Sequence, residues 1–335
     1  MNHFPDFARW PRGRFNAITD VGGVRVGHRT MRDGGINTGV TAIRPHGGNV
    51  FRKKLVASSH VINGFGKAVG LPQIDELGQL ETPILLTNTL SVPACAEALI
   101  RQAIGENPDI GRTTSTVNPV VGECNDGPLN DIQSLAIRPE DAMAALDAAT
   151  SGRVAQGSVG AGTGMTCFGF KGGVGTSSRR VDIEGEIFTL GGLVVSNFGR
   201  PGRLILPDGR TPEPPSGIPT DERGSIMICL ATDAPLDARQ LRRVCARAGA
   251  GLARLGSFWG NGSGDFVIGF STATEIDHDA ATPVRMITAL NEAFIDAFFE
   301  ATAELTQEAV LNSMLCSNDF EGFLGRKRLS LRNAL

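Results

Sequence analysis

The stretch Gly260-Asn261-Gly262-Ser263-Gly264-Asp265 runs directly into Phe266-Val267-Ile268-Gly269-Phe270. The second segment is rich in β-forming residues and predicts a strand. In the first segment, a serine lies between two glycines beside an Asn-Gly pair, which is a common signal of a tight hairpin turn. The same geometry suits a peptide bond held in an unusual conformation, whose carbonyl the Ser263 hydroxyl could attack. On this stretch alone, a simple hairpin and a self-cleaving turn both stay open.

Length and charge narrow the class of protein. The chain has 335 residues with 32 Lys+Arg and 35 Asp+Glu, a net charge of -3. It is long enough for one large domain or two, and it has no basic surplus that would indicate a nucleic-acid partner. Its start lacks the apolar core of a signal peptide, and no run of about 18 apolar residues predicts a membrane span. We expect a cytoplasmic protein, with secretion by a route without such a signal left open.

Cysteine and histidine usage argues against disulfides and metal. The six cysteines form no C-x-x-C pair, which fits reduced, buried thiols better than a disulfide framework. The five histidines show no H-E-x-x-H pattern, so no metal site and no cofactor are expected. The chain has no tyrosine, so a tyrosine general acid is excluded.

The order of elements predicts an α+β sandwich with sheets inside and helices outside. Strict βαβ alternation is absent, which counts against a doubly wound fold. Apolar runs predict strands at 23–28, 39–43, 54–58, 82–87, 185–195 and 225–231, and helices over 93–104, from 139, and over 238–255. From Thr282 onward, the apolar spacing predicts a long helical region made of two packed helices. The segment 200–222, rich in Pro and Gly, is predicted to be a mobile surface loop.

The glycine-dense segment 157–175 invites comparison with phosphate-binding loops. Its spacing does not fit G-x-G-x-x-G, and the Walker pattern fails at Phe170-Lys171-Gly172. Close packing of strands, or a turn against a neighbouring chain, explains the glycines better. Lys171 is equally a candidate site residue or an ordinary surface lysine.

Four further polar residues can be interpreted in two ways. Asn197 ends an apolar strand, where its amide could donate to an oxyanion or form a turn. Glu123 lies in an acidic, amide-rich segment that could hold a substrate ammonium or form a turn. Thr302 and Glu304 lie in the terminal helical region. Residues two apart on a helix do not face the same side, so the two either both point inward where the helix breaks or bends, or Glu304 lies exposed on the helix surface.

Eight sequence motifs together resemble the L-aminopeptidase/D-esterase (DmpA-type) and β-aminopeptidase family. They follow the family order from about residue 15 to about residue 315, and jointly they are highly specific. They are Asn16-Ala17-Ile18-Thr19-Asp20-Val21; Val24-x-Val26-Gly27-His28; Thr82-Pro83-Ile84 with Leu86-Thr87-Asn88-Thr89-Leu90; Pro119-Val120-Val121-Gly122-Glu123; Asn125-Asp126-Gly127; 170–179; 231–236; and Gly260 to Asp265 with Phe270-Ser271-Thr272-Ala273.

The resemblance implies a self-processing hydrolase with a four-layer αββα sandwich of the N-terminal-nucleophile type. By motif, Ser263 is the nucleophile, freed by cleavage after Gly262 of one domain (1–335) into a large chain, 1–262, and a small chain, 263–335. Asn197 matches the oxyanion asparagine and Glu123 the acid that binds the substrate amine. Thr302 and Glu304 match a polar pair that supports the nucleophile, and Lys171 matches a site lysine. The family also implies small peptide, amide or ester substrates and a homotetramer of processed pairs.

The chain departs from the family pattern at three places. Pro128 replaces an expected aromatic residue, the 200–222 loop is longer than usual, and the tail after Cys316 differs. These departures bear on substrate preference more than on the type of reaction. Acyl transfer of the ornithine-acetyltransferase type and an uncleaved, non-catalytic binding protein remain alternatives, and a nicotinamide-dependent dehydrogenase ranks last.

Overall fold

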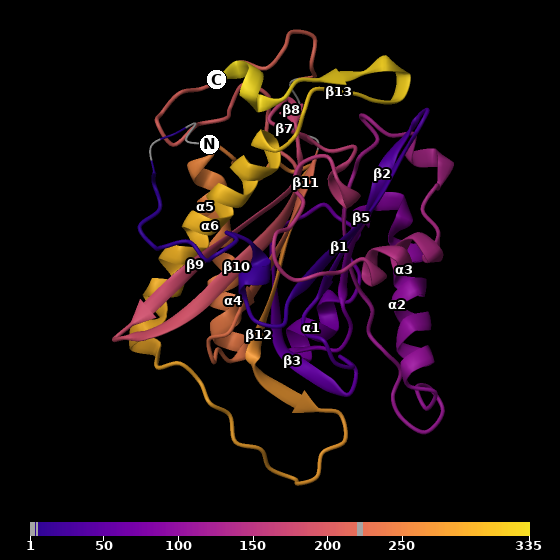
Figure 1. Cartoon of the computed structure of the whole chain (residues 1–335), viewed down its shortest axis with the longest axis vertical. Coiled ribbons are helices and arrows are strands. Elements are labelled where there is room, and N and C mark those ends of the chain that lie inside the picture. Colours follow the sequence, from indigo (N-terminus) through magenta and orange to yellow (C-terminus); the bar gives the residue numbers. More distant parts are fainter. Residues whose placement is uncertain (1–3, 5, 220–223) are drawn as a thin grey trace.

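The computed structural model describes residue 4, residues 6–219 and residues 224–335. Most strands of the described residues fall into two sheets (Figure 1). The first has the order β1-β2-β5-β6, and the second has the order β4-β3-β12-β11-β10-β9. The strands of these two sheets are β1 Arg25–Asp33, β2 Ile36–Arg44, β3 Lys53–Gly64, β4 Gln79–Leu80, β5 Ile84–Asn88, β6 Val120–Cys124, β9 Gly173–Ile183, β10 Glu186–Asn197, β11 Ser225–Thr232 and β12 Gly264–Asp277.

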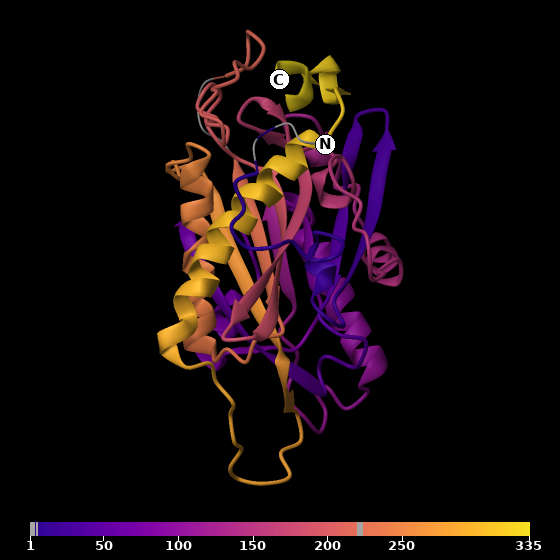
Figure 2. The same ribbon diagram turned by 60° about the vertical axis from the view of Figure 1, so that its left-hand side comes forward.

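Helices cover the outer face of each sheet, so the chain forms the four-layer αββα sandwich that the sequence resemblance implied. The helices α4, α5 and α6 lie on one side of the molecule and α2 and α3 on the other (Figures 1 and 2). A short helix, α1, packs against β3. The helices are α1 Leu71–Leu77, α2 Val92–Glu106, α3 Pro139–Asp147, α4 Ala238–Ala246, α5 Ala248–Arg254 and α6 Ile295–Leu315.

Three apolar cores hold the layers together. The inner core joins the two sheets, with Ile43 and Leu86 of the first sheet packed among Leu193 and Ile268 of the second. A second core joins the larger sheet to α4, α5 and α6, and a third joins the smaller sheet to α2 and α3. Burial on both faces explains why β5, β6 and β11 read as nearly continuous apolar runs in the sequence.

Two parallel strand pairs, β5–β6 and β11–β12, interrupt the otherwise antiparallel pairing. The chain between the strands of the first pair includes α2, and that of the second includes α4 and α5, as parallel crossovers require. The rest of the pairing in both sheets is antiparallel. The expectation that strict βαβ alternation is absent is therefore confirmed.

The prediction of two packed helices from Thr282 onward is wrong. One helix, α6, begins only at Ile295, and Met286 and Val284 are 97% and 77% exposed in an irregular segment before it. The sequence has helical apolar spacing here, but these two side chains are exposed to solvent and do not pack against the described residues. Because tertiary packing supplies most of a helix's stability, no helix forms in this segment. The helix instead starts beyond Glu292, which forms ion pairs with Arg239 and Arg243.

Other expectations need smaller corrections. The helix predicted over 238–255 is two helices, α4 and α5, which meet at Arg247. Asn261 and Gly262 form a turn but no hairpin, because β12 pairs with β3 and β11, and the chain enters the turn from α5. The helix starting at Pro139 is confirmed.

Segment 198–219 has no helix or strand, and residues 220–222 of the predicted long loop lie outside the described residues. Five cysteines are buried and unpaired as expected, whereas Cys316 is exposed. No helix within the described ranges is long and apolar enough to span a membrane.

Candidate active site

Ser263 lies in a tight turn at the start of β12 and is fully buried. Its backbone N–H donates to the carbonyl oxygen of Gly260 at 2.9 Å, which closes the turn. Its hydroxyl donates to Oδ1 of Asp265 at 2.6 Å. The Nδ2 of Asn63, on the neighbouring strand β3, donates to the carbonyl oxygens of Ser263 and, at 3.2 Å, of Gly260. The turn is thus held by hydrogen bonds on both sides of the Gly262–Ser263 peptide bond.

The register of the larger sheet brings Asn197 to the same end as Ser263. Asn197 is paired with Ser225 across β10 and β11, and Ser225 is paired with Gly264 across β11 and β12. Strands lie about 4.8 Å apart in a sheet, so Asn197 and Gly264 lie on the order of 10 Å apart. The Ser225 hydroxyl accepts a hydrogen bond from the Gly264 backbone N–H at 3.2 Å, which ties the Ser263 turn to the strand between them.

The side-chain amide of Asn197 is held in one orientation. Its Oδ1 accepts from the Thr166 backbone N–H and its Nδ2 donates to the Asn125 carbonyl oxygen, both at 2.9 Å. Asn197 is only 2% exposed. An amide fixed in this way keeps one N–H of its Nδ2 group available as a preorganised donor.

Glu123 lies at the end of β6 with its carboxylate almost fully buried. Its oxygens accept from the Lys67 backbone N–H at 2.8 Å and from the Thr89 hydroxyl. The Lys67 ammonium lies instead 4.3 Å from the centre of the Phe65 ring. Within the described part of the chain, Glu123 has no ion pair, so a buried negative charge lacks a cation.

The 65–67 segment links Glu123 to the Ser263 turn. Gly64 is in register with Gly264 across β3 and β12. A Cβ placed on Gly264 would lie 2.6 Å from the Phe65 carbonyl oxygen, so the two segments are in direct backbone contact. Ser263, Asn197 and Glu123 therefore converge at one end of the sandwich.

Lys171 is buried near this region, but its ammonium has other partners. Its Nζ donates to the carbonyl oxygens of Gly162, Met165 and Gly172 at 2.8–3.0 Å. All three ammonium protons are used, and burial lowers the Lys171 pKa well below its ordinary value. The expectation of an ordinary surface lysine is wrong, and this structure shows a lysine that ties the glycine-rich segment together.

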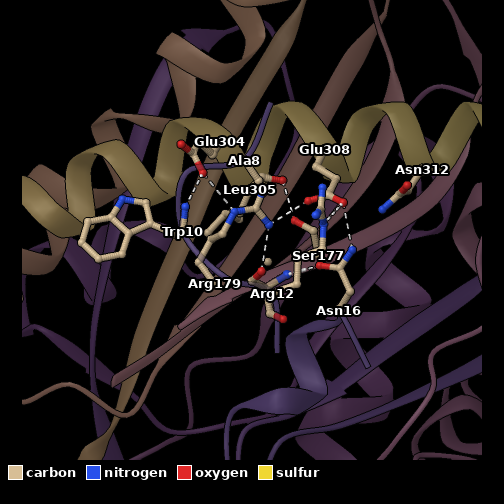
Figure 3. Close-up of polar contacts among 12 residues, drawn as sticks. Ala8, Trp10, Arg12, Asn16, Ser177, Arg179, Glu304, Leu305, Glu308 and Asn312 are labelled. Carbon is tan, nitrogen blue, oxygen red and sulfur yellow. Dashed lines mark hydrogen bonds and ion pairs between the residues drawn. The ribbon is translucent and has the colours of Figure 1, made fainter. Parts of the chain in front are cut away.

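Thr302 and Glu304 are not brought into hydrogen-bond contact with Ser263. The Thr302 hydroxyl donates to the Phe298 carbonyl oxygen one turn earlier in α6. Glu304 accepts from the backbone N–H groups of Arg9 and Trp10 and from Nε of Arg179, as Figure 3 shows for Trp10 and Arg179. Among the described residues, no hydrogen bond joins either side chain to the candidate nucleophile. Glu304 fastens α6 to β9 and to the N-terminal segment, whereas the Thr302 hydroxyl is bonded within α6 itself.

Sequence reasoning missed three residues of the site: Asp265, Asn63 and Thr89. Asp265 had a readable signal, because residues two apart on a strand face the same side, and Ser263 and Asp265 are two apart. Asn63 and Thr89 come from other elements, β3 and the turn after β5, and no local pattern pointed to them. Pro128, where the sequence departs from the family, lines a cavity together with Asn125 and Thr166.

The fold and this convergence define an α+β hydrolase of the N-terminal-nucleophile class. A family model described as peptidase family S58 matches residues 16–328. The beta-peptidyl aminopeptidase BapA of Sphingosinicella microcystinivorans is 36% identical over 93% of this chain and 84% of its own.

Solved structures agree with this assignment. A beta-aminopeptidase from Burkholderia sp. superposes with a TM-score of 0.87 at 38% identity, covering 97% of this chain and 93% of its own. The L-aminopeptidase D-Ala-esterase/amidase of Ochrobactrum anthropi, a prototype of the serine aminopeptidases and a variant Ntn-hydrolase fold, superposes with a TM-score of 0.88 at 34% identity, covering 98% and 95%. The chain belongs to peptidase family S58 and is an aminopeptidase.

Proposed function

We propose that this aminopeptidase cleaves its own Gly262–Ser263 bond. It then uses Ser263 to release the N-terminal residue from short peptides, amino-acid amides or esters. The observation that carries the proposal is Glu123, a buried carboxylate beside the Ser263 turn with no cationic partner among the described residues. A buried charge without a counter-ion is costly unless a ligand supplies one. A substrate's free α- or β-ammonium supplies that charge and places the adjacent carbonyl near Ser263.

Self-cleavage proceeds by attack of the Ser263 hydroxyl on the Gly262 carbonyl carbon. A C–O bond forms and the C–N bond breaks, so that Gly262 becomes an ester on Oγ and the Ser263 nitrogen becomes a free amine. Water then hydrolyses the ester and leaves a Gly262 carboxylate. The hydrogen bonds from Asn63 polarise the carbonyls around the turn and hold its backbone in place.

In the cleaved enzyme, one residue supplies both nucleophile and base. A free α-amine has a reference pKa of about 7.7–8.0, so near neutral pH it accepts the hydroxyl proton as Ser263 attacks the substrate. The amine then passes that proton to the leaving group, and water hydrolyses the acyl ester. Cleavage also removes the peptide link that holds Ser263 in its turn, which lets the hydroxyl rotate from Asp265 toward Asn197 and the substrate. The fixed amide of Asn197 donates to the developing oxyanion.

The proposal is tested with Ser263→Ala and a matched control, Ser257→Ala, in the same connection between α5 and β12. We expect Ser263→Ala to stay a single 335-residue chain without peptidase activity, while Ser257→Ala gives two chains that separate on a denaturing gel and whose masses match 1–262 and 263–335. A Ser263→Ala protein that still splits at this bond would refute the proposal. Product analysis with an added amine acceptor separates hydrolysis from acyl transfer.

The role of Glu123 is tested with Glu123→Gln, with exposed Glu76→Gln as its control. Loss of one partner of a buried charge pair typically costs about 2–5 kcal/mol, so kcat/KM for substrates with a free amine should fall by about thirtyfold to several thousandfold. Wild-type enzyme should not act on N-acetylated forms of the same substrates. Equal turnover of free and acetylated substrates would remove Glu123 from amine binding. Homo-oligomerisation and a cytoplasmic location stay predictions from the sequence.

A further inference from the structure

A cavity of about 600 Å³ opens beside Asn197, at the end of the sandwich where the β7–β8 and β13–β14 hairpins lie. These hairpins are formed by Thr166–Cys167 with Phe170–Lys171 and by Phe320–Glu321 with Lys327–Arg328. Asn125, Gly127 and Pro128 and parts of the irregular segment 198–219 form the rest of its described wall. Arg326 and Arg328 reach the cavity, and none of its described lining residues is acidic. This volume is within the range of small-ligand sites.

Arg326 and Arg328 have no anionic partner among the described residues. Arg328 donates from Nη1 to the Lys327 carbonyl oxygen at 2.7 Å, and its buried Nε has no hydrogen-bond partner within the part of the chain that the structure describes. Arg326 makes only two long contacts of 3.4 Å, to the carbonyl oxygens of Gly127 and Pro128. Neither forms an ion pair with a described residue. The acidic residue of the same hairpin, Glu321, is instead paired with Lys327.

Two neighbouring guanidinium groups without a counter-ion repel each other. Burial and the charge of Arg326 both lower the Arg328 pKa. An anion between the two groups relieves this repulsion and satisfies the free Nε–H. Guanidinium groups bind carboxylates through paired, directional hydrogen bonds, so a carboxylate is the ligand that this wall fits.

We infer that this cavity binds the carboxylate of the leaving portion of a short peptide, with Arg326 and Arg328 as specificity-determining residues. The inference rests on the proposed function, because Glu123 marks where the substrate amine lies. Glu123 and Pro128 are five residues apart, and such a chain spans at most about 18 Å when extended. Asn197 lies between them through its bond to Asn125. A negative end, a reaction centre and a positive end in this order suit a zwitterionic peptide of a few residues.

The test compares free-acid and amide forms of one leaving group. Wild type, Arg326→Gln and Arg328→Gln are assayed with alanyl-L-alanine and alanyl-L-alanine amide, each in L-alanyl and β-alanyl form. Lys327→Gln is the matched control, because Lys327 belongs to the same hairpin but is exposed. A charged hydrogen bond contributes about 1.5–3 kcal/mol, so wild type should favour the acid by at least about tenfold in kcat/KM. Arg328→Gln should abolish this preference mainly by lowering the value for the acid, and Lys327→Gln should keep it.

Equal turnover of acid and amide by wild type overturns the inference, as does an equal effect of Arg328→Gln on both. A binding measurement separates this outcome from failure of the proposed function. Calorimetric titration of Ser263→Ala with the same peptides needs no turnover. Tighter binding of the acid that is lost in Ser263→Ala/Arg328→Gln supports the cavity assignment even if wild type hydrolyses neither peptide. Equal affinity for acid and amide overturns it.

Discussion

Arg179 of β9 and Glu304 of α6 form an ion pair inside the protein, with 3.2 Å between Nε and Oε2 and with side chains 0% and 2% exposed. A second carboxylate, Glu308, lies 2.7 Å from Nη1 of the same guanidinium and also binds Arg12 (Figure 3). Removing one partner of a buried pair is costly, because the other charge stays buried and uncompensated. This cluster joins the outer helix layer, the larger sheet and the N-terminal segment.

The first prediction concerns Glu304→Gln, which keeps the shape of the side chain and removes its charge. A buried charge left without any partner costs about 3–5 kcal/mol, but Arg179 keeps Glu308 as a partner. We therefore expect the free energy of unfolding to fall by less than about 3 kcal/mol, with kcat of the folded fraction changed less than tenfold. Urea denaturation and active-site titration measure the two quantities separately. Unchanged stability with a large loss of kcat would contradict this prediction and favour the role that the resemblance implies, in which Glu304 supports the nucleophile.

A second prediction concerns Asn197→Ala. Loss of an oxyanion donor typically lowers kcat about 10²–10³-fold, and KM should change little because the substrate amine is held by Glu123. The variant also loses hydrogen bonds to Thr166 and Asn125, at about 1 kcal/mol each, so its melting temperature should drop modestly. If kcat of the folded fraction falls less than tenfold, Asn197 is a turn-forming residue only.

The third prediction concerns the pH dependence of stability. Burial raises the pKa of Asp126 to about 7, against hydrogen bonds from Thr38 and Asn130 that lower it. A group with a raised folded-state pKa stabilises the fold below its unfolded value, near 3.8, and loses this contribution as pH rises toward 7. The stability of wild type relative to Asp126→Asn should therefore decrease between pH 4 and pH 7, by at most about 1.4 kcal/mol per pH unit.

Urea titrations of both proteins at several pH values measure this difference. His28 provides an internal contrast, because burial lowers its pKa to about 4, so its contribution is lost as pH falls through the same range. A stability difference between wild type and Asp126→Asn that does not change with pH would show that Asp126 is ionised throughout.

The fourth prediction concerns Gly175 of β9, where α6 crosses the sheet. A Cβ there would lie 1.9 Å from the Ala309 carbonyl oxygen. Gly175→Ala should push α6 outward and destabilise the fold by about 1–3 kcal/mol or more. Gly105→Ala is the matched control, because Gly105 lies within α2 with open space around it and alanine favours a helix by up to about 1 kcal/mol. Equal melting temperatures for the two variants would contradict the close approach.

The layers of the fold could be predicted because they depend on apolar runs and on a motif order that extends over most of the chain. The residue at which α6 begins could not be predicted from the sequence. The apolar spacing at 286–290 is helical, yet only packing against the sheet decides where a helix forms. The buried Arg179 was equally invisible, because arginine is almost never fully buried unless paired and its partners are 125 and 129 residues away.

The residues of the candidate site also fall into two groups, those that sequence motifs identified and those that no sequence pattern indicated. Ser263, Asn197 and Glu123 stood out because each lies at the end of a strand within a distinctive motif. Their supporting contacts come from the Lys67 backbone and the Thr89 hydroxyl, which are distant in sequence and have no pattern of their own. Thr302 and Glu304 matched by residue type and spacing alone. In the structure, Glu304 anchors α6 to β9 and the N-terminal segment, and the Thr302 hydroxyl bonds within α6.

The position of β12 determines how the protein would recover from denaturation after the proposed cleavage. This strand lies inside the larger sheet, paired with β3 on one side and β11 on the other. A cut at Ser263 therefore leaves a 73-residue fragment whose first strand is enclosed by the other fragment and whose α6 covers β9 and β10. Under the proposed cleavage, the precursor folds as one molecule, whereas the cleaved pair has to refold as two. Its recovery after denaturation would therefore depend on protein concentration, and cleavage would act as a one-way step in the life of the enzyme.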